Sequence, residues 1–195
     1  MNATNKLLLT GAILLGLGAA GFGAWWAARE ADTPGPPLSG TVADFTLMET
    51  PRPMPAQPFT DENGKAMSFA DFEGRVLLVN LWATWCAPCR AEMTALDRLE
   101  ARLGGVDFAV LPISFDIDGA KAVLPFYEKF GLQHLPVALD PASAIGHALG
   151  FAGLPTTILV DRDGNGVGYL LGPAEWDAPE AEALIRHYIG IGAPD

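Results

Sequence analysis

Cys86 and Cys89 are the only two cysteines in the 195-residue chain, and they lie three positions apart in the segment WCAPC. An apolar run precedes them and a helical pattern follows, which predicts a position at the start of a helix. The free amide donors and the helix dipole there stabilise a thiolate, so Cys86 is the expected nucleophile. Cys89, one turn further on and less exposed, is expected to resolve the mixed disulfide formed by Cys86. The pattern predicts dithiol/disulfide exchange.

Other interpretations of the cysteine pair have less support. A zinc site needs four protein ligands, or three and a water, and there is no second cysteine pair. The histidines, His134, His147 and His187, are scattered far from the motif. A purely structural bridge would close a loop too short to stabilise the fold much in the chain-entropy model. We therefore expect neither a bound metal nor a cofactor, although binding of Cu(I) by the two soft thiolates stays open as an alternative.

The elements around the motif predict an α/β domain. The run 76–82 (VLLVNLW) is typical of a strand buried on both faces, and 90–103 has helical spacing ended by a glycine pair. A strand is expected over 106–114, then a helix capped by Asp118 that runs to Phe130. Further elements are expected as a hairpin around 61–65, a short helix over 141–149, a hairpin of 156–160 with 167–171, and a helix over 180–189. This order implies a central mixed β-sheet flanked by helices on both faces.

The N-terminal part of the chain differs in composition. Residues 1–6 form a short flank, and 7–28 carry no charge over a length that can span a membrane. A cleaved secretory signal and an uncleaved transmembrane signal-anchor both fit; the length and the Trp25-Trp26 pair favour the anchor. Residues 29–58 are rich in proline and are predicted to form a tether, within which 42–48 is a candidate docking strand. The folded domain is predicted over 59–195.

The charge of the chain excludes some partners. Twelve basic and 23 acidic residues give a net charge of −11, which argues against nucleic acid and against anionic lipid headgroups as partners of the soluble part.

Four segments together resemble a known family: DENGK at 61–65, DFEGR at 71–75, VNLWATWCAPCRAE at 79–92, and LPTT at 154–157. From about residue 59 onward the chain is similar to the thioredoxin superfamily, and to its membrane-tethered, periplasm-facing TlpA/ResA-like branch with a redoxin (AhpC-TSA-like) domain. The resemblance implies a thioredoxin fold and a thiol:disulfide oxidoreductase.

The resemblance also implies roles for residues near the cysteines. Pro155 is expected to be a cis-proline facing the pair, and the backbone of Leu154 to bind a peptide substrate by β-strand addition. Trp85 and Pro88 belong to the expected substrate-binding surface. Glu92 matches an acidic residue that can influence the cysteine pKa values, since positions three apart share a helix face.

One position departs from cytosolic thioredoxin. Asn80 stands where thioredoxin has a buried Asp, and a neutral amide cannot shuttle a proton. That duty would fall to Glu92 or to water. Trp82, on the same strand, is expected in the core.

The expected function is reduction of client protein disulfides or cysteine pairs in the periplasm of a bacterium. The chain would be a single-pass protein of the inner membrane that takes electrons from a DsbD/CcdA-like thiol donor. The resemblance suggests clients in cytochrome c maturation or in assembly of the copper centre of cytochrome oxidase. A disulfide oxidant and a copper chaperone remain alternatives, because sequence does not give the reduction potential. A thiol peroxidase would need a Thr-x-x-Cys context that the segment lacks.

Overall fold

The sheet is built around two central strands, β4 (Val76–Trp82) and β5 (Phe108–Ser114). The computed structural model describes residues 35–151 and 153–190. Every residue of both strands is buried, as their apolar runs predicted. The strands run parallel, and Trp82 lies opposite Ser114 at their carboxyl ends. The connection between them contains α2 (Ala87–Leu103), the helix that carries the cysteine motif.

The sheet is mixed, as expected. β4 pairs with β5 in parallel and with β7 antiparallel, and the order of the strands is β1-β8-β7-β4-β5-β6-β2-β3. The remaining strands are β1 (Thr46–Pro53), β2 (Phe59–Thr60), β3 (Ala66–Met67), β6 (Ala138–Leu139), β7 (Thr156–Val160) and β8 (Asn165–Leu171). The remaining helices are η1 (Gly40–Val42), η2 (Phe69–Phe72), α3 (Ala120–Phe130), α4 (Ala144–Leu149) and α5 (Pro179–Gly190).

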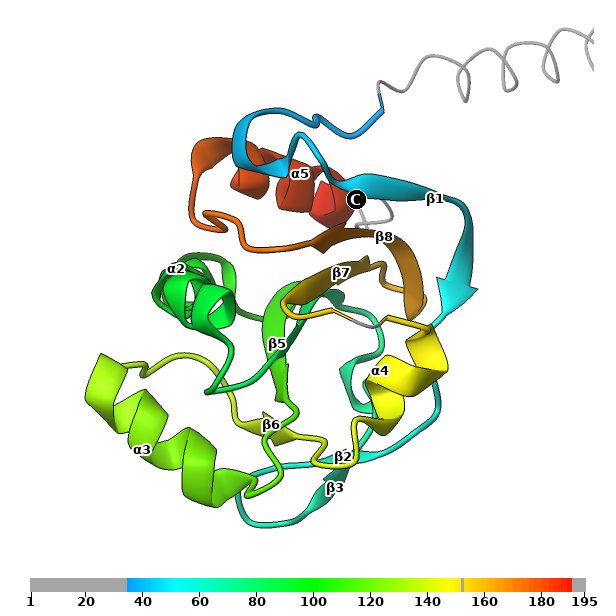
Figure 1. Ribbon diagram of the computed structural model, residues 1–195. Coiled ribbons are helices and arrows are strands. Elements are labelled where there is room, and N and C mark those ends of the chain that lie inside the picture. The colour runs from blue at the N-terminus through cyan, green and yellow to red at the C-terminus, as the bar shows by residue number, and fades with distance from the viewer. Residues whose placement is uncertain (1–34, 152, 191–195) are drawn as a thin grey trace, which may run out of the picture. The chain divides into compact units, whose positions relative to one another are not determined.

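Helices cover both faces of this sheet, which gives the expected three layers (Figure 1). Leu78 and Trp82 of β4 belong to one core cluster with residues of α2, α3 and α5. Leu77 and Val79, which point to the opposite face, belong to a second cluster with Ile145 of α4 and with η2. The alternation of side chains along β4 therefore serves two separate cores.

One local prediction was wrong, and one short strand was missed. Asp118 does not cap α3 with its side chain: the N-cap is Gly119, at φ 52°, and Asp118 contributes its backbone carbonyl to Lys121. The two-residue strand β6 was not predicted, because its bounds are set by pairing with β5 and β2 and not by a local pattern.

Part of the predicted tether is folded onto the domain. β1 pairs antiparallel with β8 and forms one edge of the sheet. Ahead of it, η1 is held by hydrogen bonds from Thr41 N to Glu180 and from Glu175 N to Thr41 Oγ1. Val42 and Phe45 are buried in the core cluster that contains α5. The folded domain thus begins before residue 59. The candidate strand at 42–48 overlaps the last residue of η1 and the first three residues of β1, which continues to Pro53.

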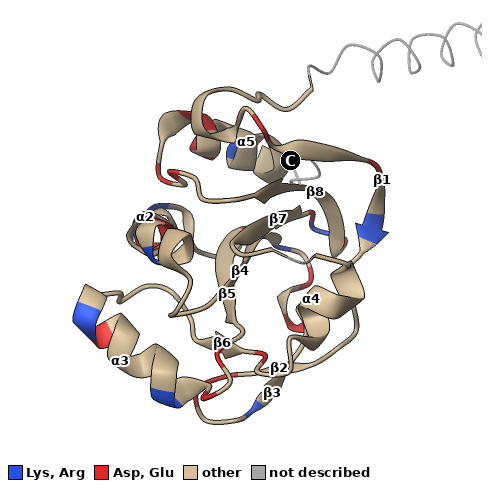
Figure 2. Cartoon of the chain, in the orientation of Figure 1, with Lys and Arg blue, Asp and Glu red and all other residues tan. Residues whose placement is uncertain are grey.

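Charged residues lie on the helices, on β1 and in the loops, while the central strands β4, β5 and β7 carry none (Figure 2). The segment 7–28, predicted to span a membrane, lies outside the described residues. Among the residues that the structure describes, no helix is both long enough and apolar enough to cross a bilayer.

Candidate active site

Cys86 and Cys89 form a disulfide at the amino end of α2. Cys86 is the N-cap residue of this helix, and its Sγ accepts a hydrogen bond of 3.3 Å from the backbone N–H of Cys89. Pro88, in the first turn, lacks a donor where the helix needs none. Cys86 retains 5% exposure and Cys89 has none, so Cys86 is the sulfur that a partner can reach first.

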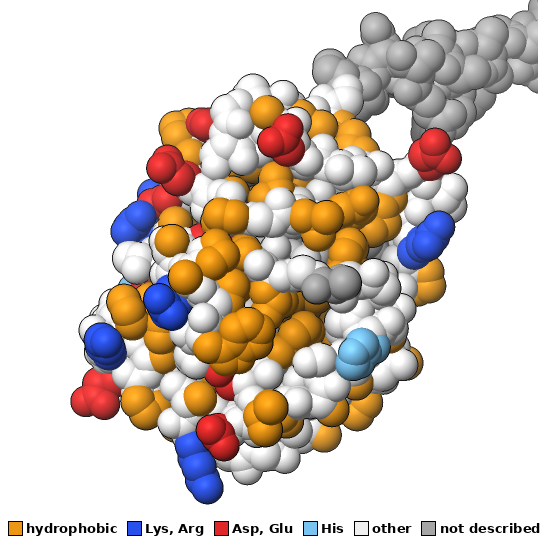
Figure 3. Space-filling model, in the orientation of Figure 1, with side chains coloured by type: hydrophobic (Ala, Val, Ile, Leu, Met, Phe, Trp, Pro, Cys, Tyr) orange, Lys and Arg blue, Asp and Glu red, His pale blue; other side chains and the backbone are white. Residues whose placement is uncertain are grey.

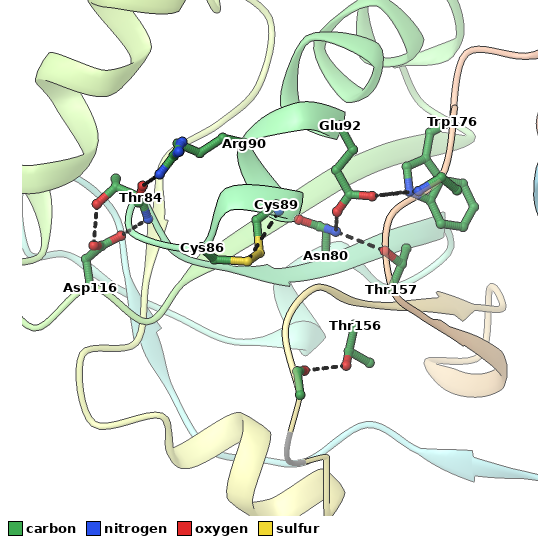
Figure 4. The surroundings of a disulfide bond; sticks show 12 residues. Asn80, Thr84, Cys86, Cys89, Arg90, Glu92, Asp116, Thr156, Thr157 and Trp176 are labelled. Atoms are coloured by element: carbon green, nitrogen blue, oxygen red, sulfur yellow. Dashed lines mark hydrogen bonds between the residues drawn. A yellow bond between two sulfur atoms is a disulfide. The ribbon is translucent and has the colours of Figure 1, made fainter.

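The loop before Cys86 is fixed by Asp116, which follows the end of β5. The backbone N–H and the hydroxyl of Thr84 both donate to the Asp116 carboxylate, at 2.9 and 2.6 Å. Ser114 donates to the same carboxylate at 2.8 Å. Arg90 donates to the Thr84 carbonyl at 3.2 Å (Figure 4). The segment between β4 and α2 is therefore tied to both β5 and α2, and Trp85 projects from it with 66% exposure.

Pro155 precedes β7, at the end of that strand next to which β4 leads into the cysteine motif. β4 and β7 are antiparallel, with Leu81 opposite Thr156, so the residues after Leu81 are adjacent to those before Thr156. The Leu154–Pro155 peptide bond is cis, as the resemblance implied. Thr156 Oγ1 donates to the Gly153 carbonyl at 2.7 Å and fixes the turn. Leu154 is half-buried, and Pro155 is buried.

A largely apolar cavity of about 640 Å³ opens between these two loops. Trp85 and Leu154 form part of its wall, together with Phe115, Ile117 and His147. The space-filling view shows apolar side chains gathered across the middle of the same face of the molecule (Figure 3). A surface of this kind next to a reactive disulfide suits an apolar side chain of a bound peptide.

Glu92 lies on α2 three residues after Cys89, and it is 2% exposed. Its carboxylate accepts hydrogen bonds from Asn80 Nδ2 at 2.8 Å, from Ala174 N at 3.1 Å and from Trp176 Nε1 at 3.1 Å. Burial raises the pKa of Glu92 to about 7, although the three hydrogen bonds oppose that rise. Glu92 is thus a buried carboxyl group and not a solvated surface residue.

The structure brings the predicted site residues together in two layers. Trp85, Cys86 and Leu154 are at or near the surface, whereas Cys89 and Glu92 are buried beneath it. Trp82 is fully buried, as expected. Sequence reasoning missed Asp116, although it follows the carboxyl end of a predicted strand, where side chains from neighbouring parallel strands meet. It also missed Ala174 and Trp176, which no local pattern connects to Glu92.

His134 lies outside this site, where its Nδ1 is 3.0 Å from an Asp97 carboxylate oxygen. Within residues 35–151 and 153–190 there is no group of three or more His, Cys, Asp or Glu side chains arranged to hold a metal ion.

Comparison with known proteins identifies the family. The family model described as Redoxin matches residues 42–185. The chain belongs to the redoxin family. The matched region begins at residue 42, in agreement with the docking of η1 and β1 onto the domain.

Individual relatives agree with this assignment. The chain is 31% identical over 169 residues to the thiol-disulfide oxidoreductase ResA of Bacillus thuringiensis, which covers 86% of this chain and 89% of the relative. A candidate thiol-disulfide oxidoreductase from Bacteroides vulgatus has a TM-score of 0.60 at 29% identity, covering 70% and 94% of the two chains. A candidate thiol:disulfide interchange protein DsbE from Chlorobium tepidum has a TM-score of 0.65 at 24% identity, covering 73% and 99%, and supports the thioredoxin-like fold. The redoxin domain and these relatives make the protein a thiol:disulfide oxidoreductase of the ResA-like group.

Proposed function

We propose that this redoxin is a reductase of protein disulfides, anchored in the inner membrane of a bacterium by residues 7–28, with its domain in the periplasm. The observation that carries the proposal is the disulfide of Cys86 and Cys89 at the start of α2, directly after the exposed Trp85. The cis Leu154–Pro155 bond precedes β7, the strand that pairs with β4. A membrane thiol donor of the DsbD/CcdA type would return the pair to its reduced form.

The exchange proceeds in two steps, each of which conserves electrons. The Cys86 thiolate attacks one sulfur of a client disulfide, forms a mixed disulfide, and displaces the other client sulfur, which takes up a proton. Cys89 then loses its proton, and its thiolate attacks Cys86 Sγ. This releases the second client thiol and leaves the Cys86–Cys89 disulfide seen in the structure. The hydrogen bond from Cys89 N and the helix dipole favour the thiolate on Cys86.

Client binding would use the two loops around the disulfide. Neither the N–H nor the C=O of Leu154 forms a hydrogen bond with another described residue, so both are free to pair with an extended peptide. An apolar side chain of that peptide would enter the cavity between Trp85 and Leu154. Pro88, in the first turn of the same helix, would border the peptide close to its cysteine.

The raised pKa of Glu92 supports a role for this residue in proton transfer. A carboxyl group with a pKa of about 7 exchanges protons near neutral pH, and it shares a helix face with the cysteine that must lose its proton in the second step. Glu92 would adjust the cysteine pKa values through this proximity. Clients in cytochrome c maturation or copper-centre assembly fit such a reductase.

The first test is the reduction potential of the Cys86/Cys89 couple, measured by equilibration with defined thiol buffers. We expect a value near or below that of thioredoxin, roughly −270 mV. A value near that of DsbA, roughly −120 mV, would reverse the proposed direction and make the protein an oxidant.

The second test separates the two thiols. Cys89→Ser, which keeps the nucleophile but cannot resolve, should accumulate mixed disulfides with clients in the membrane fraction. The matched control Cys86→Ser should not accumulate them. Equal trapping by both variants would contradict the assigned roles, and recovery of the full-length chain in the soluble fraction would contradict the anchor.

A further inference from the structure

In the oxidised protein the amide nitrogen of Asn80 forms hydrogen bonds, but its amide oxygen has no partner among the described residues. Asn80 is fully buried, and its Nδ2 donates to Glu92 Oε1 at 2.8 Å and to Thr157 Oγ1 at 2.9 Å. Its Oδ1 is also buried and has no hydrogen-bond partner among the described residues. A buried acceptor without a partner is costly and calls for a functional explanation.

The placement of Asn80 suggests which group completes this contact. Cys89 and Glu92 are three residues apart on α2 and share one face, and Glu92 binds the Asn80 side chain. Leu78 and Trp82, which flank Asn80 on the same face of β4, share a core cluster with Cys89. Figure 4 draws Asn80 between the disulfide and Glu92, with its amide nitrogen on the Glu92 side. The oxygen is thereby left on the side of the cysteines.

The oxidised and reduced forms differ in the donors that they offer. In the disulfide neither sulfur carries a hydrogen, so Cys89 has nothing to donate. Reduction adds two electrons and two protons and converts the bridge into two thiols, of which the one on Cys89 is fully buried. A thiol is a weak donor and needs an acceptor when it is buried.

We propose that Asn80 Oδ1 is the acceptor for the S–H of reduced Cys89, a contact that forms on reduction and persists in the mixed disulfide with a client. It holds Cys89 in its protonated form until the resolving step. There the proton leaves, the hydrogen bond is lost, and the Cys89 thiolate attacks Cys86 Sγ. Asn80 thus joins the resolving thiol on one side to Glu92 on the other.

The contact stabilises only forms in which Cys89 carries a proton, and it therefore makes the couple less reducing than it would otherwise be. A thiol is a weak donor, so its contribution lies at the lower end of the range for hydrogen bonds in proteins. Removing it should shift the equilibrium with glutathione about two- to threefold toward the disulfide.

The S–H stretching vibration tests the contact directly, since it moves to lower wavenumber when the thiol donates a hydrogen bond. In the full-length Cys86→Ser protein, Cys89 is the only thiol. We expect its band below that of the same chain unfolded in urea, and expect Asn80→Leu in this background to move the band up. Thr157→Val, which removes a partner of Nδ2 but keeps Oδ1, should leave the band in place.

A second measurement uses the intact pair at pH 5, where Glu92 holds its proton and adds no charge difference between variants. Glu92 is the one titratable group hydrogen-bonded to Asn80 among the described residues. Asn80→Leu should shift the glutathione equilibrium toward the disulfide, and Thr157→Val should not.

The proposal would be overturned if the S–H band of folded Cys86→Ser lay at the same wavenumber as the band of the unfolded chain. This comparison does not require an Asn80 variant. That result would favour a water bridging Oδ1 and Trp82 Nε1, the other buried polar atom on this face of β4 without a described partner. An unshifted glutathione equilibrium in a folded Asn80→Leu protein would also overturn it. Neither result would touch the proposed direction of electron flow, which the absolute potential decides.

Discussion

Replacing Glu92 by Gln should remove a large part of the pH dependence of stability. Glu92 is buried, and its pKa rises from 4.5 to about 7 on folding, chiefly because burial disfavours the charged form. Gln has the same shape and no titration in this range. The Gln side chain places an amide donor opposite the donors of Asn80, Ala174 and Trp176, which lowers the stability of the variant by the same amount at every pH. The informative quantity is therefore the change of the free energy of unfolding with pH.

The sign of the effect follows from proton binding. Between pH 4.5 and 7 the folded protein keeps the Glu92 proton and the unfolded chain loses it, so the folded state binds more protons. The free energy of unfolding therefore falls as the pH rises through this window and levels off above pH 7. The rise of about 2.5 pH units corresponds to about 3 kcal/mol.

Urea denaturation of the oxidised protein at several pH values between 4 and 8 measures this slope. The difference between wild type and Glu92→Gln should change by about 3 kcal/mol across the window, in the direction that favours the variant at high pH. Glu128→Gln, at an exposed position on α3, is the matched control and should follow the wild type. Parallel curves for wild type and Glu92→Gln would refute the assignment of a raised pKa to Glu92.

Three further predictions concern the loops and the edge strand. Asp116→Ala should lower the free energy of unfolding by about 1–3 kcal/mol in urea denaturation, because the buried hydroxyl of Ser114 and the partly buried donors of Thr84 lose their acceptor; an unchanged midpoint would contradict this role. Trp85→Ala should lower kcat/KM for a disulfide-containing peptide about tenfold, which corresponds to about 1.4 kcal/mol of lost apolar contact, and should leave the reduction potential unchanged. An equal fall in kcat/KM for a small disulfide without a peptide would argue against binding of the peptide to Trp85. Gly168→Val should cost about 1–3 kcal/mol and speed proteolysis of β1, since a Cβ there meets the Phe45 ring and lies 2.8 Å from the Thr46 carbonyl; unchanged proteolysis would count against docking of β1.

The sequence predicted the elements whose own composition determines them. The bounds of β4 were predicted at both ends, because a continuous apolar run is buried on both faces of a central strand. β1 was instead assigned to the tether on account of its prolines, Pro51 and Pro53. It lies at the edge of the sheet, where a missing N–H can face away from the pairing strand, so the prolines are compatible with it.

In the functional site, too, the features set by local sequence were predicted, and those set by distant contacts were not. The cysteine pair and the helix face shared by Cys89 and Glu92 follow from local spacing, whereas the resemblance to the thioredoxin superfamily implied the cis-proline at Pro155. The burial of Glu92 depends on Ala174 and Trp176, which reach it from more than 80 residues away. Burial beneath this distant segment raises the pKa of Glu92 to about 7, although the two hydrogen bonds by themselves lower it.

Asn80 shows why such contacts matter for the chemistry. The sequence indicates only that a neutral amide replaces a carboxylate beneath the motif, which removes one proton carrier. The structure shows that the amide nitrogen donates to Glu92 and to Thr157. The amide oxygen is buried and forms no hydrogen bond with either residue. A carboxylate at this position would repel an ionised Glu92, whereas the amide stabilises it. An amide at position 80 is therefore compatible with the proposed proton transfer by Glu92, which lies on the same face of α2 as Cys89.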